Sequence, residues 1–125
     1  MSTDCPFCNI APERILWQND HVFVIYDGFP VSKGHALVIP KRHNASFFEA
    51  TSDERNTLLT GLDYAKQRIE DDYQPAAFNI GINDGQAAGQ TVPHLHVHVI
   101  PRYDGDVDDP RGGVRWIFPD KAKYW

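Results

Sequence analysis

The sequence predicts an α+β domain built on a mainly antiparallel sheet with one long helix. Three short apolar segments come first, one segment with helical periodicity follows over residues 52–72, and two more apolar segments come after it. No internal repeat, linker or low-complexity segment divides the chain of 125 residues. We therefore expect a single domain with one modest core.

The first three strands are expected before the helix. Arg14–Gln18 and His21–Tyr26 are apolar segments joined by a short turn, and the second is almost continuously apolar, which suits a covered sheet. Residues 27–34 contain glycine and proline and are predicted to form a loop. The third strand is predicted over His35–Pro40, and Pro40 should end it.

A long helix is expected from about Ser52 to Asp72. Thr51 and Glu54 have the spacing of a capping box, in which each side chain accepts a hydrogen bond from the backbone of the other. Gly61 costs about 1 kcal/mol relative to alanine inside a helix, which weakens the prediction only slightly. The apolar stripe expected to pack in the core consists of Leu58, Leu62, Ala65 and Ile69.

A strand over Ala76–Ile82, a polar loop over residues 83–91 and a strand that carries three histidines are expected to follow. In this last strand imidazoles alternate with aliphatic side chains. Residues i, i+2 and i+4 of a strand share one face, so His94, His96 and His98 are predicted to line one side of the sheet. The residues predicted to pack into the core on the other side are Leu95, Val97 and Val99.

Three histidines on one face have two possible uses. A zinc ion can be held by two of them, but hardly by all three, because the outer pair lies about 13 Å apart at ~3.3 Å per residue. Alternatively, the middle imidazole is a nucleophile and its neighbours orient it or bind charge. The preceding loop favours the second use, because Gly85 and Gly89 allow backbone N–H groups to converge on an anion. This combination predicts attack on phosphorus.

The sequence has two cysteines, Cys5 and Cys8, separated by a proline and a phenylalanine. Such a pair is a redox site, half of a metal site or two free thiols. A thioredoxin-type redox site follows a buried strand, whereas only four residues precede Cys5. A structural zinc site would need two more ligands, for which histidines are suitable.

Charge and hydropathy exclude several classes of function. The net charge is −5 with neutral histidines, which argues against a general affinity for nucleic acid. No apolar segment approaches the ~20 residues of a membrane span, and the N-terminus lacks the basic-then-apolar order of a secretory signal. We therefore expect a cytoplasmic protein without a membrane or nucleic-acid partner.

The segment Gly89–Ile100 resembles the histidine-triad (HIT) motif of nucleotide hydrolases and transferases. The upstream segment Asp27–His43 resembles the nucleoside-binding half of the same family, and together the two segments extend the resemblance over most of the chain. Asp27 and Asn83 are similar to the Hint-like branch, which hydrolyses phosphoramidates. Val99–Arg102 is instead similar to the Fhit-like branch, which hydrolyses dinucleoside polyphosphates. The resemblance thus implies a bacterial-type HIT protein with features of both branches.

This resemblance implies a HIT fold over residues 1–125, with the segment 1–10 and the tail 104–125 docked on it, and a homodimer that shares one sheet. It also implies that His96 attacks the α-phosphate of a purine ribonucleotide, which is a dinucleoside polyphosphate or a nucleoside phosphoramidate. A covalent nucleotidyl-histidine intermediate would then release AMP or GMP. His98 would be a hydrogen-bond donor or general acid for the phosphate or the leaving group.

The resemblance also implies the binding residues. Asp27 would accept hydrogen bonds from the ribose hydroxyls, and the nucleotide-binding set would be Asp27, Asn83, Gly89, Gln90, Thr91, Val92 and His98. A structural Zn²⁺ would be held by Cys5, Cys8, His43 and His94, and no organic cofactor is expected. Additional candidates near the substrate are His35, Arg111, Arg115 and Trp116. The arginines would bind a second phosphate and the tryptophan would stack on a base, unless the tail is merely docked with solvated arginines.

Two other functions remain open at this point. The protein could be a nucleotide-binding regulatory or scaffold protein with little turnover. It could also be a zinc-dependent hydrolase in which the histidines are catalytic ligands.

Overall fold

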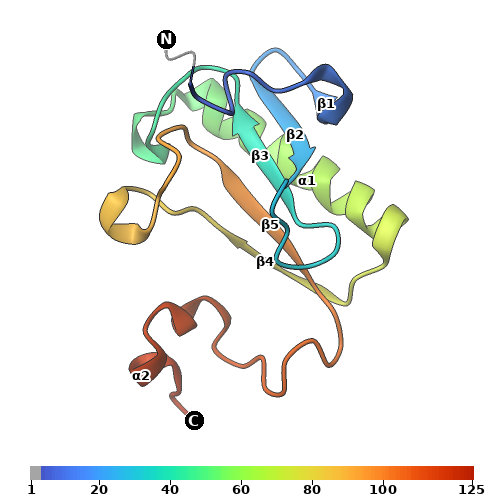
Figure 1. Cartoon of the computed structure of the whole chain (residues 1–125), viewed down its shortest axis with the longest axis vertical. Helices are drawn as coiled ribbons and strands as arrows, with labels where there is room; N and C mark the ends of the chain where they lie inside the picture. The colour runs from blue at the N-terminus through green and yellow to red at the C-terminus, as the bar shows by residue number, and fades with distance from the viewer. Residues whose placement is uncertain (1–3) are drawn as a thin grey trace.

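The computed structural model describes residues 4–125, so positions 1–3 of the predicted cysteine segment lie outside the described residues. The described chain forms a five-stranded sheet and one long helix (Figure 1). The sheet order is β1-β2-β3-β5-β4, and every neighbouring pair is antiparallel. The strands are β1 (Ile15–Gln18), β2 (Val22–Tyr26), β3 (Ala36–Pro40), β4 (Ala77–Gly81) and β5 (Val97–Arg102). The predicted α+β class is confirmed.

The histidine strand is shorter than predicted, because β5 begins at Val97 rather than at His94. Its neighbour β3 ends at Pro40, which has no backbone N–H to continue the ladder. The N–H of Leu95 instead donates to the carbonyl of Asn44 at 2.6 Å. His94 and His96 therefore precede the strand, and of the three histidines His98 alone lies within it.

The long helix α1 (Ser52–Tyr73) begins at the predicted capping box. Thr51 Oγ1 accepts from the N–H of Glu54 at 3.1 Å, and Glu54 Oε1 accepts from the N–H of Thr51 at 2.8 Å. Arg42 adds two hydrogen bonds to the Glu54 carboxylate, at 2.8 and 3.0 Å. The buried carboxylate thus joins the start of the helix to the end of β3.

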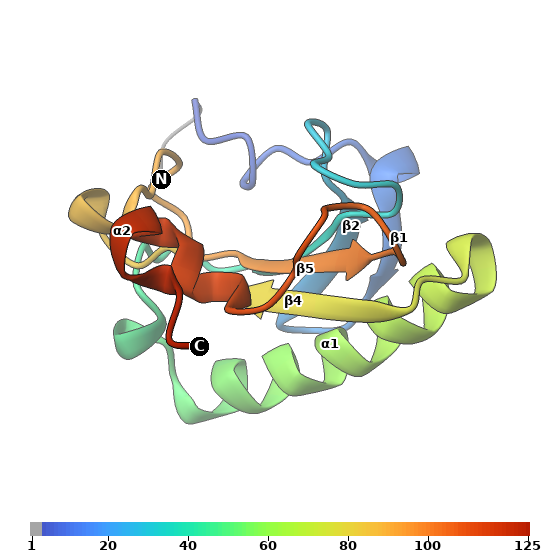
Figure 2. The ribbon, with the colours of Figure 1, turned by 90° about the horizontal axis from the view of Figure 1, so that it is seen from below.

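The helix covers one face of the sheet (Figure 2). Its predicted stripe packs there, with Leu58, Ala65 and Ile69 buried and Leu62 partly buried. The sheet residues of this core are Val22, Val24, Ala36, Val38, Val97 and Val99, joined by Leu95. Among the described residues, no helix is long and apolar enough to cross a membrane.

The opposite face carries a smaller core and the loops that surround the histidines. Ile25, Leu37 and Ile39 are buried there, and Phe7 and Ile10 of the N-terminal segment pack against them. The loop between β2 and β3 and the first part of the C-terminal tail also lie over this face, and the tail then follows the edge strand β4 (Figure 2). One face of the sheet is thus covered by the helix, whereas the other carries the histidines and the loops around them.

Gly61 sets the distance between α1 and the sheet. A Cβ atom at this position would lie 2.5 Å from Val38 Cγ1, which is closer than packed carbon atoms allow. The glycine that weakens the helix in isolation is therefore required by its packing.

We expect Gly61→Ala to lower the free energy of unfolding by about 1–3 kcal/mol, because the clash with Val38 outweighs the ~1 kcal/mol gain in helix propensity. Denaturation in urea measures the difference. Thr60→Ala, at the adjacent exposed position, is the control and should be neutral or slightly stabilising. A Gly61→Ala protein more stable than the parent would refute this account of the packing.

Candidate functional site

The three histidines lie on the face of the sheet opposite α1. Leu95, Val97 and Val99 point into the core beneath the helix, so the imidazoles between them lie on the other side, as the alternation predicts. The rings of His96 and His98 have centroids 5.1 Å apart. The sheet therefore brings two of the imidazoles together, whereas the third has a different environment.

His94 is fully buried, and both of its ring nitrogens have partners. Its Nε2 lies 2.7 Å from the carbonyl oxygen of Pro40, so Nε2 carries the proton and donates. The lone pair is therefore on Nδ1, which faces the two cysteines and His43. Burial lowers the pKa of His94, and the Pro40 carbonyl opposes this effect.

His96 is oriented by the backbone of the same segment. Its Nδ1 lies 2.8 Å from the carbonyl oxygen of His94, and a carbonyl can only accept, so the proton is on Nδ1. Nε2 then carries the lone pair. The ring of Phe7 packs against this imidazole with centroids 4.9 Å apart. His96 is thus half-buried, with a fixed ring and a basic nitrogen.

A chain of hydrogen bonds gives His98 the opposite polarity. The backbone N–H of Val31 donates to Nδ1 of His35 at 3.1 Å, so the proton of His35 is on Nε2. This Nε2 lies 3.0 Å from Nδ1 of His98 and donates to it. His98 therefore carries its own proton on Nε2. Two neighbouring rings thus differ: His96 has a lone pair on Nε2, whereas His98 has an N–H there.

Asp27 completes this group at the end of β2. Its Oδ2 lies 3.4 Å from Nε2 of His35, and its Oδ1 accepts from the N–H of Phe29 at 2.9 Å. Burial lowers the pKa of His35, and the Asp27 carboxylate opposes the shift. Burial also lowers the pKa of His98, and charge on His96 or His35 would lower it further. Both rings are therefore neutral at neutral pH.

The potential metal-ligand atoms of Asp27, His35 and His98 are close enough together to surround a cation. However, these three side chains come together without a metal ion, because the N–H at Nε2 of His35 donates to His98 and faces the carboxylate of Asp27.

The loop before the histidines contains two glycines with positive φ, as the anion-binding prediction needs, with φ of 99° at Gly85 and 93° at Gly89. The side chain of Gln90 braces the loop, since it accepts from the N–H of Gly85 and donates to the carbonyls of Ala45 and Val92. Within residues 4–125, no group accepts from the backbone N–H of Thr91 or Val92. Of the residues predicted to bind the nucleotide, the exposed ones are Asn83, Gly89 and Thr91.

A second cluster lies beside His94. Cys5, Cys8, His43 and His94 each offer a ligand atom, and these atoms all lie within 4.8 Å of one another. The two Nδ1 atoms are 3.2 Å apart, and the nitrogen–sulfur separations are 3.2, 3.4 and 3.6 Å. A tetrahedral zinc ion with ordinary bond lengths requires nitrogen–nitrogen and nitrogen–sulfur separations of about 3.4 and 3.6 Å. The cluster can therefore hold a metal ion of this kind.

The tail uses its two candidate arginines internally. Arg111 forms an ion pair with Asp109 at 2.9 Å and lies over the ring of Trp125. Arg115 donates to the carbonyls of Ala122 and Lys121, both at 2.9 Å. These contacts agree with the docked-tail alternative for the arginines.

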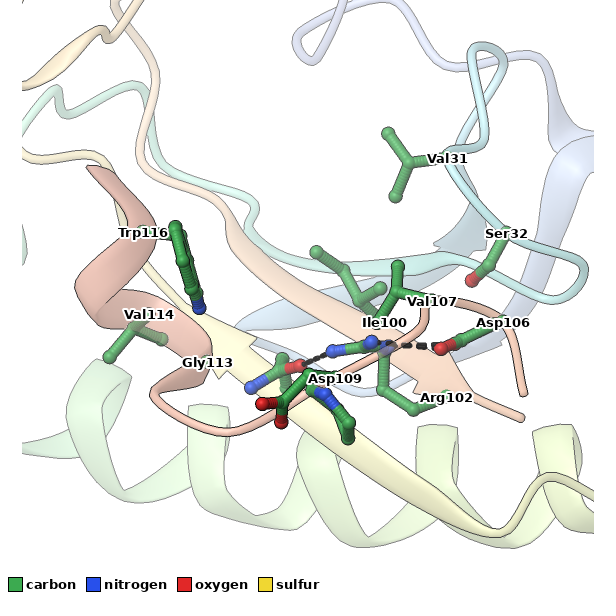
Figure 3. Close-up of a pocket in the computed structure, with 12 residues that line it drawn as sticks. Val31, Ser32, Ile100, Arg102, Asp106, Val107, Asp109, Gly113, Val114 and Trp116 are labelled. Carbon is green, nitrogen blue, oxygen red and sulfur yellow. Dashed lines mark hydrogen bonds and ion pairs between the residues drawn. The ribbon is translucent and has the colours of Figure 1, made fainter. Parts of the chain in front are cut away.

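Trp116 instead lines a cavity beside β5 (Figure 3).

Several residues of the site were missed by the sequence reasoning. Val31 and Pro40 act through backbone atoms, which leave no signal in the sequence. Phe7 contacts His96 and could have been suspected, because it lies between the two cysteines. Asp84 accepts from Ser46 and from the N–H of Phe47 and so anchors the glycine loop.

The sequence model of the HIT domain family matches residues 9–105 of this chain. The chain belongs to the HIT family. A 16.1 kDa HIT-like protein of Mycoplasma pneumoniae is 37% identical over 110 residues, which are 82% of this chain and 74% of the relative. The family match over residues 9–105 thus includes His94, His96 and His98.

Two relatives have named activities. A bis(5′-nucleosyl)-tetraphosphatase of Schizosaccharomyces pombe is 45% identical over 80 residues, 64% of this chain and 44% of that protein. An adenylylsulfatase of Arabidopsis thaliana is 33% identical over 110 residues, 85% of this chain and 56% of that protein.

Solved structures agree with the family assignment. A HIT family protein from Bacillus subtilis superimposes with a TM-score of 0.74 at 35% identity, over 82% of this chain and 75% of that chain. A zinc-bound histidine triad family protein from Mycobacterium smegmatis gives a TM-score of 0.68 at 35% identity, over 82% and 78% of the two chains. The predicted HIT fold is confirmed.

Acid should weaken the fold through His35 and His98. Their pKa values are lowered in the folded protein, so the unfolded chain binds protons first as the pH falls below about 6.5. The free energy of unfolding should therefore decrease below about pH 6.5, by at most about 1.4 kcal/mol per pH unit for each ring.

Urea denaturation between pH 5 and 8 measures this slope. His35→Gln should reduce the slope, and His21→Gln, at an exposed position, should leave it unchanged. Equal slopes in the parent and in His35→Gln would contradict the prediction.

Proposed function

We propose that the protein is a nucleotide hydrolase that transfers a nucleoside 5′-phosphate to Nε2 of His96 and then to water. The observation that carries this proposal is the hydrogen bond from His96 Nδ1 to the carbonyl of His94 at 2.8 Å, which leaves Nε2 as a free nucleophile. The tetraphosphatase and the adenylylsulfatase among the relatives support it, because both names describe cleavage at a nucleotide phosphate.

The reaction has two steps. In the first, the lone pair of His96 Nε2 forms a bond to the α-phosphorus, and the bond from phosphorus to the leaving group breaks. The leaving atom keeps the electron pair and takes a proton from water. In the second, water attacks phosphorus and gives up a proton to solvent, and the bond to Nε2 breaks with its electron pair returning to nitrogen. The products are a nucleoside monophosphate and the protonated leaving group.

His98 assists as a hydrogen-bond donor. Its Nε2–H is directed by the Val31–His35–His98 chain and lies beside the nucleophile, so it can bond to a phosphate oxygen or to the leaving atom. The backbone N–H groups of Thr91 and Val92 supply further donors to the phosphate. Such preorganised donors stabilise the charge that develops at phosphorus.

The remaining predicted contacts concern the nucleotide. Asp27 retains lone pairs beyond the hydrogen bond that it accepts from Phe29 and its contact with His35, and it accepts from the ribose hydroxyls. Asn83 donates to the phosphate. The substrate is a purine ribonucleotide with a phosphoric anhydride or phosphoramidate bond. A reaction that uses the triad as catalytic metal ligands has less support, because His96 belongs to neither cluster of candidate ligands.

We further propose that Cys5, Cys8, His43 and His94 bind one structural Zn²⁺. Two sulfur and two nitrogen ligands at tetrahedral separations suit zinc, and the relative from Mycobacterium smegmatis contains it. The bond from His94 Nε2 to Pro40 is the outer hydrogen bond that zinc-ligating histidines usually make. The metal would tie the N-terminal segment to the backbone that orients His96.

A homodimer through β4, which ends the sheet, is also proposed. Strand β4 ends the sheet, and an unpaired edge can accept another strand. Ile80 on this strand is 50% exposed, and Leu59 on the adjoining part of α1 is 62% exposed. Pairing of two such edges would bury both side chains.

His96→Ala should reduce kcat/KM by at least about 10³-fold, because no other group of the site has an equivalent free nitrogen. Mass spectrometry of the parent protein, quenched during turnover of adenosine phosphoramidate or a diadenosine polyphosphate, should reveal one added nucleoside monophosphate. The adduct should be absent in His96→Ala and present in His21→Ala. Full turnover in His96→Ala, or an adduct on another residue, would disprove the mechanism.

Protein purified without added metal should contain one zinc ion per chain, as measured by elemental mass spectrometry. His43→Ala should lose the metal and lower the free energy of unfolding by at least about 2 kcal/mol. His21→Ala should retain it. A parent protein that is folded and active without metal would refute the zinc site.

Light scattering should give twice the chain mass of 14.2 kDa. Ile80→Asp should shift the mass towards the monomer, whereas Phe29→Asp, at a position 90% exposed on the loop after β2, should not. A monomeric parent protein at micromolar concentration would refute the dimer.

A further inference from the structure

The loop between β2 and β3, residues 27–35, carries three groups of the histidine site. Asp27 begins it, His35 ends it, and the N–H of Val31 lies between them. We call it the β2–β3 loop, and it lies over the face of the sheet that carries the histidines (Figure 2). Its tip is poorly covered, since Phe29 is 90% exposed and Val31 is 73% exposed. Burial therefore does not explain what holds the Val31 N–H against His35.

Two side-chain hydroxyls join the β2–β3 loop to the end of β5. Ser32 Oγ donates to the carbonyl of Pro101 at 2.8 Å, and the hydroxyl of Tyr103 donates to the carbonyl of Lys33. Within the described residues 4–125, no other hydrogen bond joins residues 28–34 to another element of the fold. These two bonds are therefore the polar attachment of the tip to the sheet.

A turn places this attachment next to Val31. The N–H of His35 donates to the carbonyl of Ser32 at 3.1 Å and closes Ser32–His35 into a β-turn. Gly34 is the third residue of the turn and has φ of 89°, the positive value that a type II turn requires. A Cβ atom at Gly34 would also lie 2.7 Å from Cδ2 of Tyr73, at the end of α1. The turn is thus compact, and a bond to it fixes the adjacent Val31.

These contacts close a ring that returns to His98. His98 and Pro101 lie three residues apart on β5. From Pro101 the ring passes through the bond to Ser32, along the backbone to Val31, and through the Val31 N–H to Nδ1 of His35. Nε2 of His35 then donates to Nδ1 of His98. The loop that directs the proton of His98 is therefore fixed to the same strand that carries His98.

We propose that Ser32 and Tyr103 are positioning residues for His98. This role rests on the proposed nucleotidyl transfer, in which His98 donates from Nε2. The two hydroxyls hold the turn against β5, and the turn holds the Val31 N–H on Nδ1 of His35, which keeps the proton of His35 on Nε2. Without this bond the two rings exchange tautomers, and His98 presents a lone pair to the phosphate for part of the time.

Asp27, at the start of the same loop, is held separately. Its N–H donates to the carbonyl of His35 at 2.8 Å, which extends the pairing of β2 and β3 by one step. Its carboxylate also accepts from the N–H of Phe29. Loosening the turn should therefore disturb the donor on His98 more than the ribose contact, and so lower kcat rather than raise KM.

Amide hydrogen exchange of the unliganded protein, followed by NMR, tests the attachment. The Val31 amide should exchange slowly in the parent and at least about tenfold faster in the double variant Ser32→Ala with Tyr103→Phe. The amide of Val38, on the central strand β3, should keep its rate. An unchanged rate at Val31 would overturn the proposal. Equal acceleration at Val31 and Val38 would also overturn it, because the two hydroxyls would then only stabilise the whole sheet.

Steady-state kinetics with adenosine phosphoramidate and a diadenosine polyphosphate test the consequence for the reaction. In the same double variant, kcat should fall by about tenfold for each substrate, because a positioned donor contributes ~10²–10⁴-fold and is here only partly misplaced. KM should change by less than about twofold. An unchanged kcat, or a change confined to KM, would overturn the positioning role and leave the proposed hydrolase standing.

A matched double variant, Ser52→Ala with Tyr64→Phe, controls for the chemical change. The Tyr64 hydroxyl likewise donates to a backbone carbonyl, that of Leu16 at 3.3 Å, but it belongs to α1, on the face of the sheet opposite the histidines. Ser52 is exposed at the start of α1. The exchange rate at Val31 and the kinetic constants of this variant should match those of the parent, and circular dichroism establishes that both double variants are folded.

The two measurements separate the positioning role from the function beneath it. If the parent hydrolyses neither substrate, the proposed function fails, and the role of the two hydroxyls in the reaction fails with it. The exchange rates then still decide whether Ser32 and Tyr103 hold the Val31 donor. If the parent is active and the Val31 amide responds while kcat does not, the attachment is real but the reaction does not depend on it.

Discussion

The organisation of the site depends on His94, which is linked to three parts of the molecule at once. Its Nε2 donates to Pro40 at the end of β3, its Nδ1 faces the cysteine cluster, and its main-chain carbonyl accepts from His96. A fully buried imidazole with both nitrogens engaged has a single tautomer and a single orientation. The position of His96, the proposed nucleophile, therefore follows from His94, to which the proposed mechanism gives no chemical step.

Much of the fold could be predicted from short-range patterns. The capping box at Thr51 and the stripe on α1 depend on residues within one or two turns of each other, and both were correct. The alternation around His96 also gave the correct faces, even though β5 begins later than predicted. That difference arose from Pro40, a residue 57 positions before Val97, whose effect on its partner strand is visible only once the strands are paired.

The candidate site was predictable where a side chain carries the function and not where the backbone does. The polarity of His98 follows from an N–H at Val31, and nothing in that residue's identity reveals it. The role of Gly61 is similar, because the need for a missing side chain arises from Val38 on another element. The tail arginines show the converse case. Their side chains are conspicuous in the sequence, yet Arg115 satisfies carbonyls of its own segment.

The two imidazoles to which the proposed mechanism gives a part, His96 and His98, differ in what fixes their protons, and this difference bears on how such a protein can diverge. His96 is oriented by a main-chain oxygen, which no point mutation can delete. His98 is oriented by the ring of His35, which a single codon change can remove. A single substitution at His35 therefore removes what orients His98, whereas the carbonyl that orients His96 remains. On the proposed mechanism, descendants of this chain that lost His35 would keep the nucleophile His96 but lose the directed donor on His98, and so would form the nucleotidyl-histidine slowly.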